Sequence, residues 1–177
     1  MPANDKETGR LIARERDVIA AEELRIVQEA QRLEQEQLAG EQAEIRAKAT
    51  LLSKNKDSWI DTMLAVGAPG SSLFKHETTI GRLFAKRAIV DGIGWKIIHD
   101  RSAQLGHYTH EPETSNDFLI LSADGDFYYQ HTSTAAWTLP AYQMPLEHVV
   151  EKYEMDRILG SMQSIAEENR VPWQPLE

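Results

Sequence analysis

The first 58 residues contain no aromatic side chain, and this absence limits what they can fold into. All thirteen aromatic residues of the 177-residue chain lie between Trp59 and Trp173, and all six histidines follow residue 75. Aromatic side chains supply much of the buried area of a globular core. The sequence therefore predicts an extended helical segment at the N-terminus and a compact domain after it.

The N-terminal segment is rich in Ala, Leu, Glu, Gln, Lys and Arg, which are strong helix formers, and no proline occurs between Pro2 and Pro69. Apolar residues recur in it every seven positions, as they do on the side of a helix that faces a partner in a coiled coil. The predicted interaction stripe consists of Ile12, Ile19, Ile26, Leu33, Ile45 and Leu52. Because most helical stability comes from packing an apolar face, the stripe indicates oligomerisation or docking.

The two series of seven-residue repeats fall out of phase between Leu33 and Leu38, which are five residues apart, and Gly40 lies at this break. A glycine inside a helix costs about 1 kcal/mol relative to alanine. The sequence therefore leaves two alternatives, a long helix that is kinked or broken at Gly40 and a helical hairpin that turns there.

A glycine-, proline- and serine-rich stretch at residues 67–72 predicts the end of the helical arm. The expected organisation is a helical arm at 1–66, a linker at 67–73 and an α+β domain at 74–177. Within the domain we expect a helix at 80–91, capped by Thr78 or Thr79 and ended by Gly92, and a loop at 101–116. Strands are expected at 95–100, 117–123 and 126–131, and a final helix from Pro145 to about residue 169.

Asp124-Gly125 is a preferred dipeptide for a two-residue type I′ hairpin turn. This turn would place three pairs of residues opposite each other, Ser122 with Phe127, Ile120 with Tyr129 and Phe118 with His131. The predicted fold class is α+β, with a long N-terminal helix or helical hairpin, an antiparallel sheet of about three strands and a C-terminal helix.

Four histidines of the domain could meet at one end of this sheet. Neutral imidazole is a common ligand of divalent metals, so a metal-binding or metal-dependent hydrolytic α+β domain is one alternative. Its ligands would be His99, His107, His110 and His131. The His-x2-His spacing in a loop does not match known zinc motifs, and solvated loop histidines explain the pattern more simply.

A second alternative is a phosphate or nucleic-acid contact through Arg82, Lys86 and Arg87, in a dimeric DNA-associated regulator. Residues 1–56 carry a net charge of −1 and residues 57–177 a net charge of −8, which together give −9. This acidity argues against broad binding to nucleic acid or to anionic lipid. The basic residues are explained more simply as the solvated face of the expected helix.

The sequence contains no motif of nucleophilic catalysis or phosphate binding, and it has no cysteine. It also has no secretory signal and no apolar run near the ~20 residues that span a bilayer. We therefore expect a non-catalytic assembly or adaptor protein without a cofactor, cytoplasmic or part of a virion-like assembly. Its partners would be itself, a larger protein assembly, or both.

Overall fold

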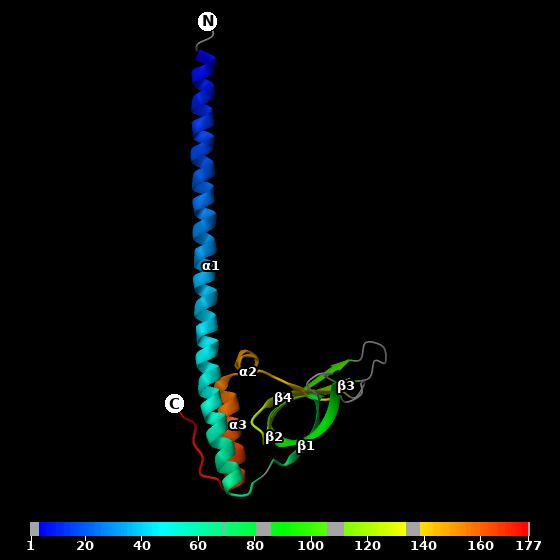
Figure 1. The fold of residues 1–177 in the computed structure, drawn as a ribbon. Helices are drawn as coiled ribbons and strands as arrows, with labels where there is room; N and C mark the ends of the chain where they lie inside the picture. The colour runs from blue at the N-terminus through cyan, green and yellow to red at the C-terminus, as the bar shows by residue number, and fades with distance from the viewer. Residues whose placement is uncertain (1–3, 69, 81–85, 106–111, 134–138, 177) are drawn as a thin grey trace. The chain divides into compact units, whose positions relative to one another are not determined.

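The computed structural model describes residues 4–68, 70–80, 86–105, 112–133 and 139–176. It has one long helix, a five-stranded antiparallel sheet and two short helices, which confirms the predicted α+β class with five strands instead of about three (Figure 1). In chain order the elements are α1 (Asn4–Ala65), β1 (Ser72–Ile80), β2 (Lys86–Leu105), β3 (Pro112–Ser122), β4 (Phe127–Ser133), β5 (Tyr142–Gln143), α2 (Leu146–Lys152) and α3 (Met155–Glu168).

The chain divides into two compact units, Met1–Glu44 and Ile45–Glu177. The described part of the first unit is α1 alone, and the second unit contains the rest of α1 together with all other elements. The sequence had placed this boundary at the linker 67–73. The structure places it inside α1, because the side chains of α1 after Glu44 belong to the core of the second unit.

Helix α1 continues through Gly40 without interruption. The helical hairpin that the sequence left open is therefore not formed, and α1 does not end at the point where the apolar repeats change phase. The cost of one glycine is small compared with the many hydrogen bonds of a 62-residue helix.

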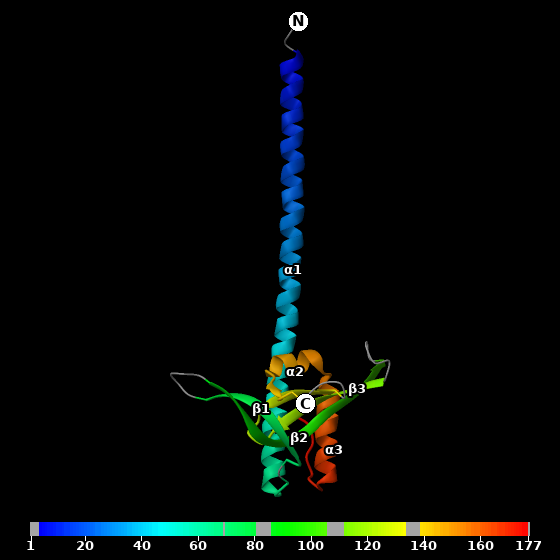
Figure 2. The same cartoon turned by 90° about the vertical axis from the view of Figure 1, so that its right-hand side faces the viewer.

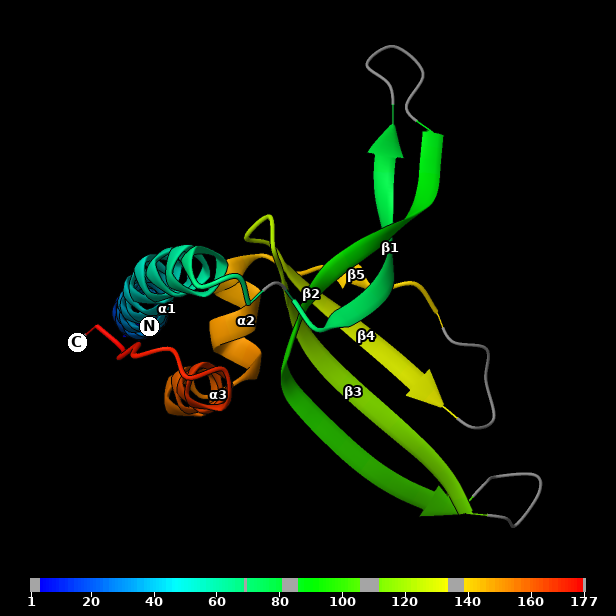
Figure 3. The same ribbon diagram turned by 90° about the horizontal axis from the view of Figure 1, so that it is seen from below.

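The core of the second unit forms where α1 meets the sheet and α3. Leu52, Trp59 and Met63 of α1 are fully buried. The ring of Trp59 meets the ring of Trp95 on β2 edge to face, with centroids 4.8 Å apart, and its indole N–H donates to the carbonyl oxygen of Met162 on α3 at 2.8 Å. Figure 3 shows this part of α1 with α2 and α3 beside the sheet.

The C-terminal segment also packs on α1. Val171 and Trp173 are buried in the same core. The fully buried side chain of Asn55 accepts a hydrogen bond from the backbone N–H of Leu176 at 2.7 Å and donates to its carbonyl oxygen at 3.2 Å. A buried amide side chain needs such partners, and here the chain's own C-terminal segment supplies them.

The sheet is organised by β2, which pairs with β1 through its first half and with β3 through its second half. The two pairs extend in different directions from the middle of β2 (Figure 2). Ala141, next to β5, donates to the carbonyl oxygen of Lys75 and accepts from the N–H of Glu77, so the last strand also meets the first. A second small core, formed by Phe74, Ile120, Tyr128 and Ala141, lies on the sheet face opposite the helices.

The helix expected at 80–91 is wrong. Residues 81–85 lie outside the described part of the chain. Residues 86–91 are the start of β2, and β2 pairs with β1 over nine residue pairs, from Lys86 to Gly94. Thr78 and Thr79 belong to β1. Gly92 does not end a helix but lies opposite Phe74, whose ring would be 2.8 Å from a Cβ at residue 92. Strand pairing outweighs the local helical pattern, as tertiary contacts commonly do.

The two hairpin strands expected from the Asp124-Gly125 dipeptide are confirmed as β3 and β4, but their register is wrong by one residue. Leu121 pairs with Phe127, and Ile120 pairs with Tyr128. The N–H of Gly125 bonds to the carbonyl oxygen of Ser122, and only Gly125 in this turn has a positive φ, of 94°. These features define a three-residue loop with a bulge at glycine instead of a type I′ turn.

Two other expectations need correction. The loop expected at 101–116 is partly strand, because β2 runs to Leu105 and β3 begins at Pro112. The single final helix is two helices, since Tyr153 and Glu154 adopt extended backbone angles between α2 and α3. Pro145 precedes the first of them, and the side chain of Tyr153 is buried.

The division inside α1 predicts which fragments fold. A fragment of residues 45–177 should unfold cooperatively on heating, because it keeps the whole core. A fragment of residues 73–177 should not, because it lacks Leu52, Trp59 and Met63. Thermal unfolding followed by circular dichroism compares the two. Cooperative unfolding of 73–177 at the same temperature as 45–177 would show that α1 is not part of the core.

Candidate interaction surface

The part of α1 in the first unit exposes large apolar side chains along its whole described length. Every residue from 20 to 44 is exposed. Five of these residues are large and apolar and are half exposed or more: Leu24, Ile26, Val27, Leu33 and Leu38. Apolar side chains that recur along a helix in this way mark a surface that packs against something else.

The structure separates the residues of the predicted interaction stripe into three groups. Ile26 and Leu33 are 59% and 55% exposed on the first unit. Ile12 and Ile19 lie on α1, but their side chains are outside the described part. Leu52 is fully buried in the core of the second unit and Ile45 packs against that core. These two residues therefore stabilise the second unit (Ile45–Glu177, called the head from here on) and do not offer a free surface.

Leu24 and Val27 were not part of the predicted stripe. Leu24 lies fourteen residues before Leu38 and is in phase with Leu38, Ile45 and Leu52. The seven-residue spacing followed backwards from Leu38 would have found Leu24, whereas Val27 is recognised only by its exposure in the structure. The exposed apolar surface of residues 20–44 is therefore wider than one stripe.

The charged side chains of this segment partly pair within the helix. Arg25 contacts Glu22 at 3.2 Å and Arg32 contacts Glu36 at 3.5 Å. Pairs at these spacings contribute only a few tenths of a kcal/mol each, roughly 0.2–0.5 kcal/mol. They support the helix weakly and leave its apolar side chains uncovered.

The head carries a second exposed apolar patch, on the outer side of the β1–β2 pair. Leu73, Ile89 and Leu139 are exposed there and line a groove with Phe74 and Pro140. Lys75 and Asp91, which face each other in the strand register, line the same groove. This patch is a second candidate contact surface of the chain.

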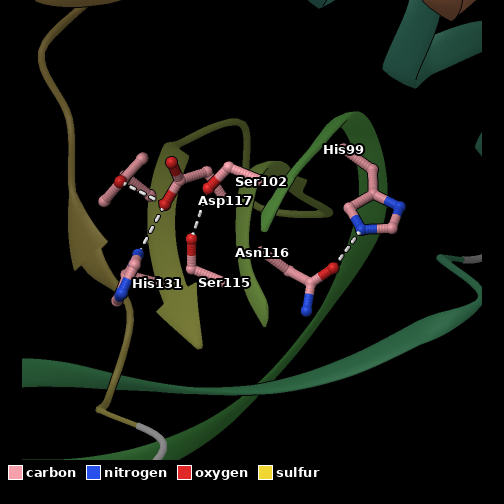
Figure 4. Close-up of polar contacts among 7 residues, drawn as sticks. His99, Ser102, Ser115, Asn116, Asp117 and His131 are labelled. Carbon is pink, nitrogen blue, oxygen red and sulfur yellow. Dashed lines mark hydrogen bonds and ion pairs between the residues drawn. The ribbon is translucent and has the colours of Figure 1, made fainter. Parts of the chain in front are cut away.

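The two described histidines of the predicted metal site, His99 and His131, lie on opposite faces of the sheet. His99 pairs with Phe118 and His131 pairs with Asp117, and consecutive residues of a strand point to opposite faces of the sheet. His99 Nε2 contacts the Oδ1 of Asn116 at 2.9 Å (Figure 4). The ring of His99 also stacks on Phe118. His107 and His110 lie outside the described residues. Within the described residues, no three His, Asp or Glu side chains are grouped as metal ligands.

Asp117 is the centre of a polar cluster on the face that carries His131. Its Oδ1 accepts hydrogen bonds from the hydroxyl of Tyr129 at 2.5 Å and from Nδ1 of His131 at 2.7 Å. The Nζ of Lys152 on α2 lies over the Tyr129 ring, 3.6 Å from its centre. Ser102 and Ser115 bond to each other nearby at 2.6 Å (Figure 4).

The pKa values of the cluster follow from these contacts. Burial alone would raise the pKa of Asp117, but the hydrogen bonds from Tyr129 and His131 and the charges of His131 and Lys152 outweigh it and hold the pKa below 3.8. Burial, with the charges of Asp100 and Asp117, raises the pKa of Tyr153 to about 12. Asp117 is thus held ionised and Tyr153 neutral.

The predicted phosphate-contacting residues are not gathered into a described site. Arg82 lies outside the described residues, and Lys86 is the first residue of β2. Arg87 is exposed and lies 3.8 Å from the carboxylate of Glu77 on β1, its neighbour in the sheet. Its charge is therefore partly offset by an acidic side chain.

Comparisons with known proteins give no relative. No protein-family model, no curated protein and no solved structure matches this chain. In the part of the chain that the structure describes, no helix is long and apolar enough to cross a membrane.

The Asp117 cluster predicts a pH-dependent contribution to stability. The pKa of Asp117 is lower in the folded than in the unfolded state, so its contribution is fully present above the unfolded value of 3.8 and is lost as the pH falls through the folded value. At pH 7 the variant Asp117→Asn should be less stable by about 1 kcal/mol. This difference should shrink below about pH 4.

Urea unfolding of both proteins between pH 7 and pH 3 measures this difference. Asp124→Asn in the exposed hairpin loop is the matched control and should not reproduce it. A difference between wild type and Asp117→Asn that stays constant down to pH 3 would contradict the role given to the carboxylate.

Proposed function

We propose that this protein is a non-catalytic assembly or adaptor protein that oligomerises or docks onto a larger complex through its helical arm. The contact surface is the exposed part of this arm, residues 20–44, which is called the arm from here on. The observation that carries the proposal is the row of exposed Leu, Ile and Val side chains on this segment. An isolated helix of mixed charge is marginal in water, and burying an apolar face supplies most of the stability of helices in proteins. A partner that covers these side chains would provide that burial.

The polar side chains of the head support the non-catalytic part of the proposal. The carboxylate of Asp117 accepts hydrogen bonds from Tyr129 and His131, and the carboxylate of Asp100 forms an ion pair with Arg157 of α3. These contacts join strands to one another and to the helices. The proposed setting is cytoplasmic or a virion-like assembly, and this part of the proposal rests on the sequence.

The proposal predicts that charges placed on the apolar side of the arm abolish assembly. Ile26→Asp with Leu33→Asp would put two uncompensated carboxylates into the packed surface. Ala39→Asp with Ala43→Asp adds the same charges on the side of the helix that carries Arg25 and Arg32. Full-length protein is isolated under mild conditions from the cells that naturally make it, and the mass of its complex is measured by light scattering.

Wild type and the Ala39/Ala43 control should be recovered in a species larger than the monomer, and the Ile26/Leu33 variant as a monomer. Circular dichroism of the purified proteins should show that the head of each remains folded. Recovery of all three proteins at the same mass would contradict an assembly role of the arm.

A further inference from the structure

The exposed apolar side chains of the arm form two rows, which we define by the rotation of roughly 100° per residue in an α-helix. Ile26 and Leu33 form the first row. Leu24, Val27 and Leu38 form the second, roughly 130° away around the helix axis. All five side chains are at least half exposed. The two rows therefore border a strip of helix surface that lies between them.

A row of glutamates runs between the two apolar rows. By the same rotation of roughly 100° per residue, Glu23, Glu34 and Glu41 all fall in the gap between them. Their side chains are exposed. Glu41 accepts a hydrogen bond from Gln37 at 3.2 Å, and within the described residues neither Glu23 nor Glu34 forms an ion pair.

The positive charges of the segment lie on the other side of the helix. Residues 20–44 contain seven glutamates and two arginines, a net charge of −5. Arg25 and Arg32 lie away from both apolar rows and contact Glu22 and Glu36 on their own side. The half of the helix surface that carries the apolar rows thus has four glutamates, including Glu44, and neither arginine.

This distribution disfavours a second copy of the arm as the partner. Two copies of residues 20–44 that pack through the apolar rows bring glutamate against glutamate in either orientation, because this half of the surface offers no cation there. Like charges that face each other across a packed interface oppose association, and the low dielectric of the interface strengthens the repulsion.

We infer, resting on the proposed function, that the arm binds a different protein, through a helical surface on which a row of Lys or Arg runs between two apolar rows. The apolar rows of the partner would cover Ile26, Leu33, Leu24, Val27 and Leu38. Its cations would pair with Glu23, Glu34 and Glu41. The arm alone is then monomeric, and its complex is sensitive to salt.

The chain itself supplies a probe of this inference. In the variant Glu23→Lys, Glu34→Lys, Glu41→Lys the arm acquires the basic row that the partner is expected to have. Full-length wild type and this variant should each be monomeric at micromolar concentration. A one-to-one mixture should form a heterodimer that binds roughly tenfold or more tighter than either protein binds itself. High salt should dissociate it, since screening weakens the ion pairs.

The matched control is the variant Glu22→Lys, Glu29→Lys, Glu36→Lys, which makes the same charge change outside the gap between the two apolar rows. Its mixture with wild type should stay monomeric. Introducing Ile26→Asp and Leu33→Asp into wild type should abolish the heterodimer, because its apolar contacts are lost. Sedimentation velocity measures all mixtures, and circular dichroism confirms that each head is folded.

In the complex isolated from the natural cells, the Glu23/Glu34/Glu41 variant should lose the partner and the Glu22/Glu29/Glu36 variant should keep it. Strong self-association of wild type would overturn the inference while leaving the assembly function standing. The inference is equally overturned if the mixture stays monomeric, if the control mixture associates equally, or if both triple variants keep the partner. If none of the arm variants loses assembly, the proposed function itself is contradicted.

Discussion

The second unit depends on the burial of Trp59, the first aromatic residue of the chain. Its ring packs edge to face against Trp95 of β2, and its indole N–H donates to the carbonyl oxygen of Met162 on α3. One side chain thus joins the helix that enters from the arm, strand β2 of the sheet and the last helix. Buried aromatic groups of this kind combine a large apolar area with one polar group that needs a partner. Here both requirements are met, so α1 between Ile45 and Ala65 is part of the head.

This anchoring explains why α1 has two roles although it is a single helix. After Glu44, its side chains Leu52, Trp59 and Met63 are buried among the sheet, α3 and the C-terminal segment that Asn55 holds. Before Ile45, the same kinds of side chain remain exposed. The difference lies in what surrounds the side chains. This exposure of the apolar side chains is the basis of the proposed assembly function.

The sequence predicts much of this fold where local signals and strand pairing agree. The aromatic boundary, the long helix and the two strands beside Asp124-Gly125 were all predictable. The segment at 86–91 was not, because its apolar spacing fits a helix and only the pairing with β1 selects a strand. The hairpin register depended on a single φ at Gly125, and the opposite orientation of His99 and His131 followed from that register. Of the candidate surface, Ile26, Leu33 and Leu38 were visible in the seven-residue repeat. Leu52 was misassigned because a repeat does not show which part of a helix is covered.

Hydrogen exchange of the backbone amides of α1 tests the central claim most directly, since it measures how strongly each part of the helix is held. In the isolated full-length protein, amides of residues 52–63 should be strongly protected by the core. Amides of residues 20–44 should exchange much faster, and should become protected only in the complex isolated from the natural cells. If residues 20–44 of the isolated monomer are already as protected as residues 52–63, the arm needs no partner, and that result would contradict the account.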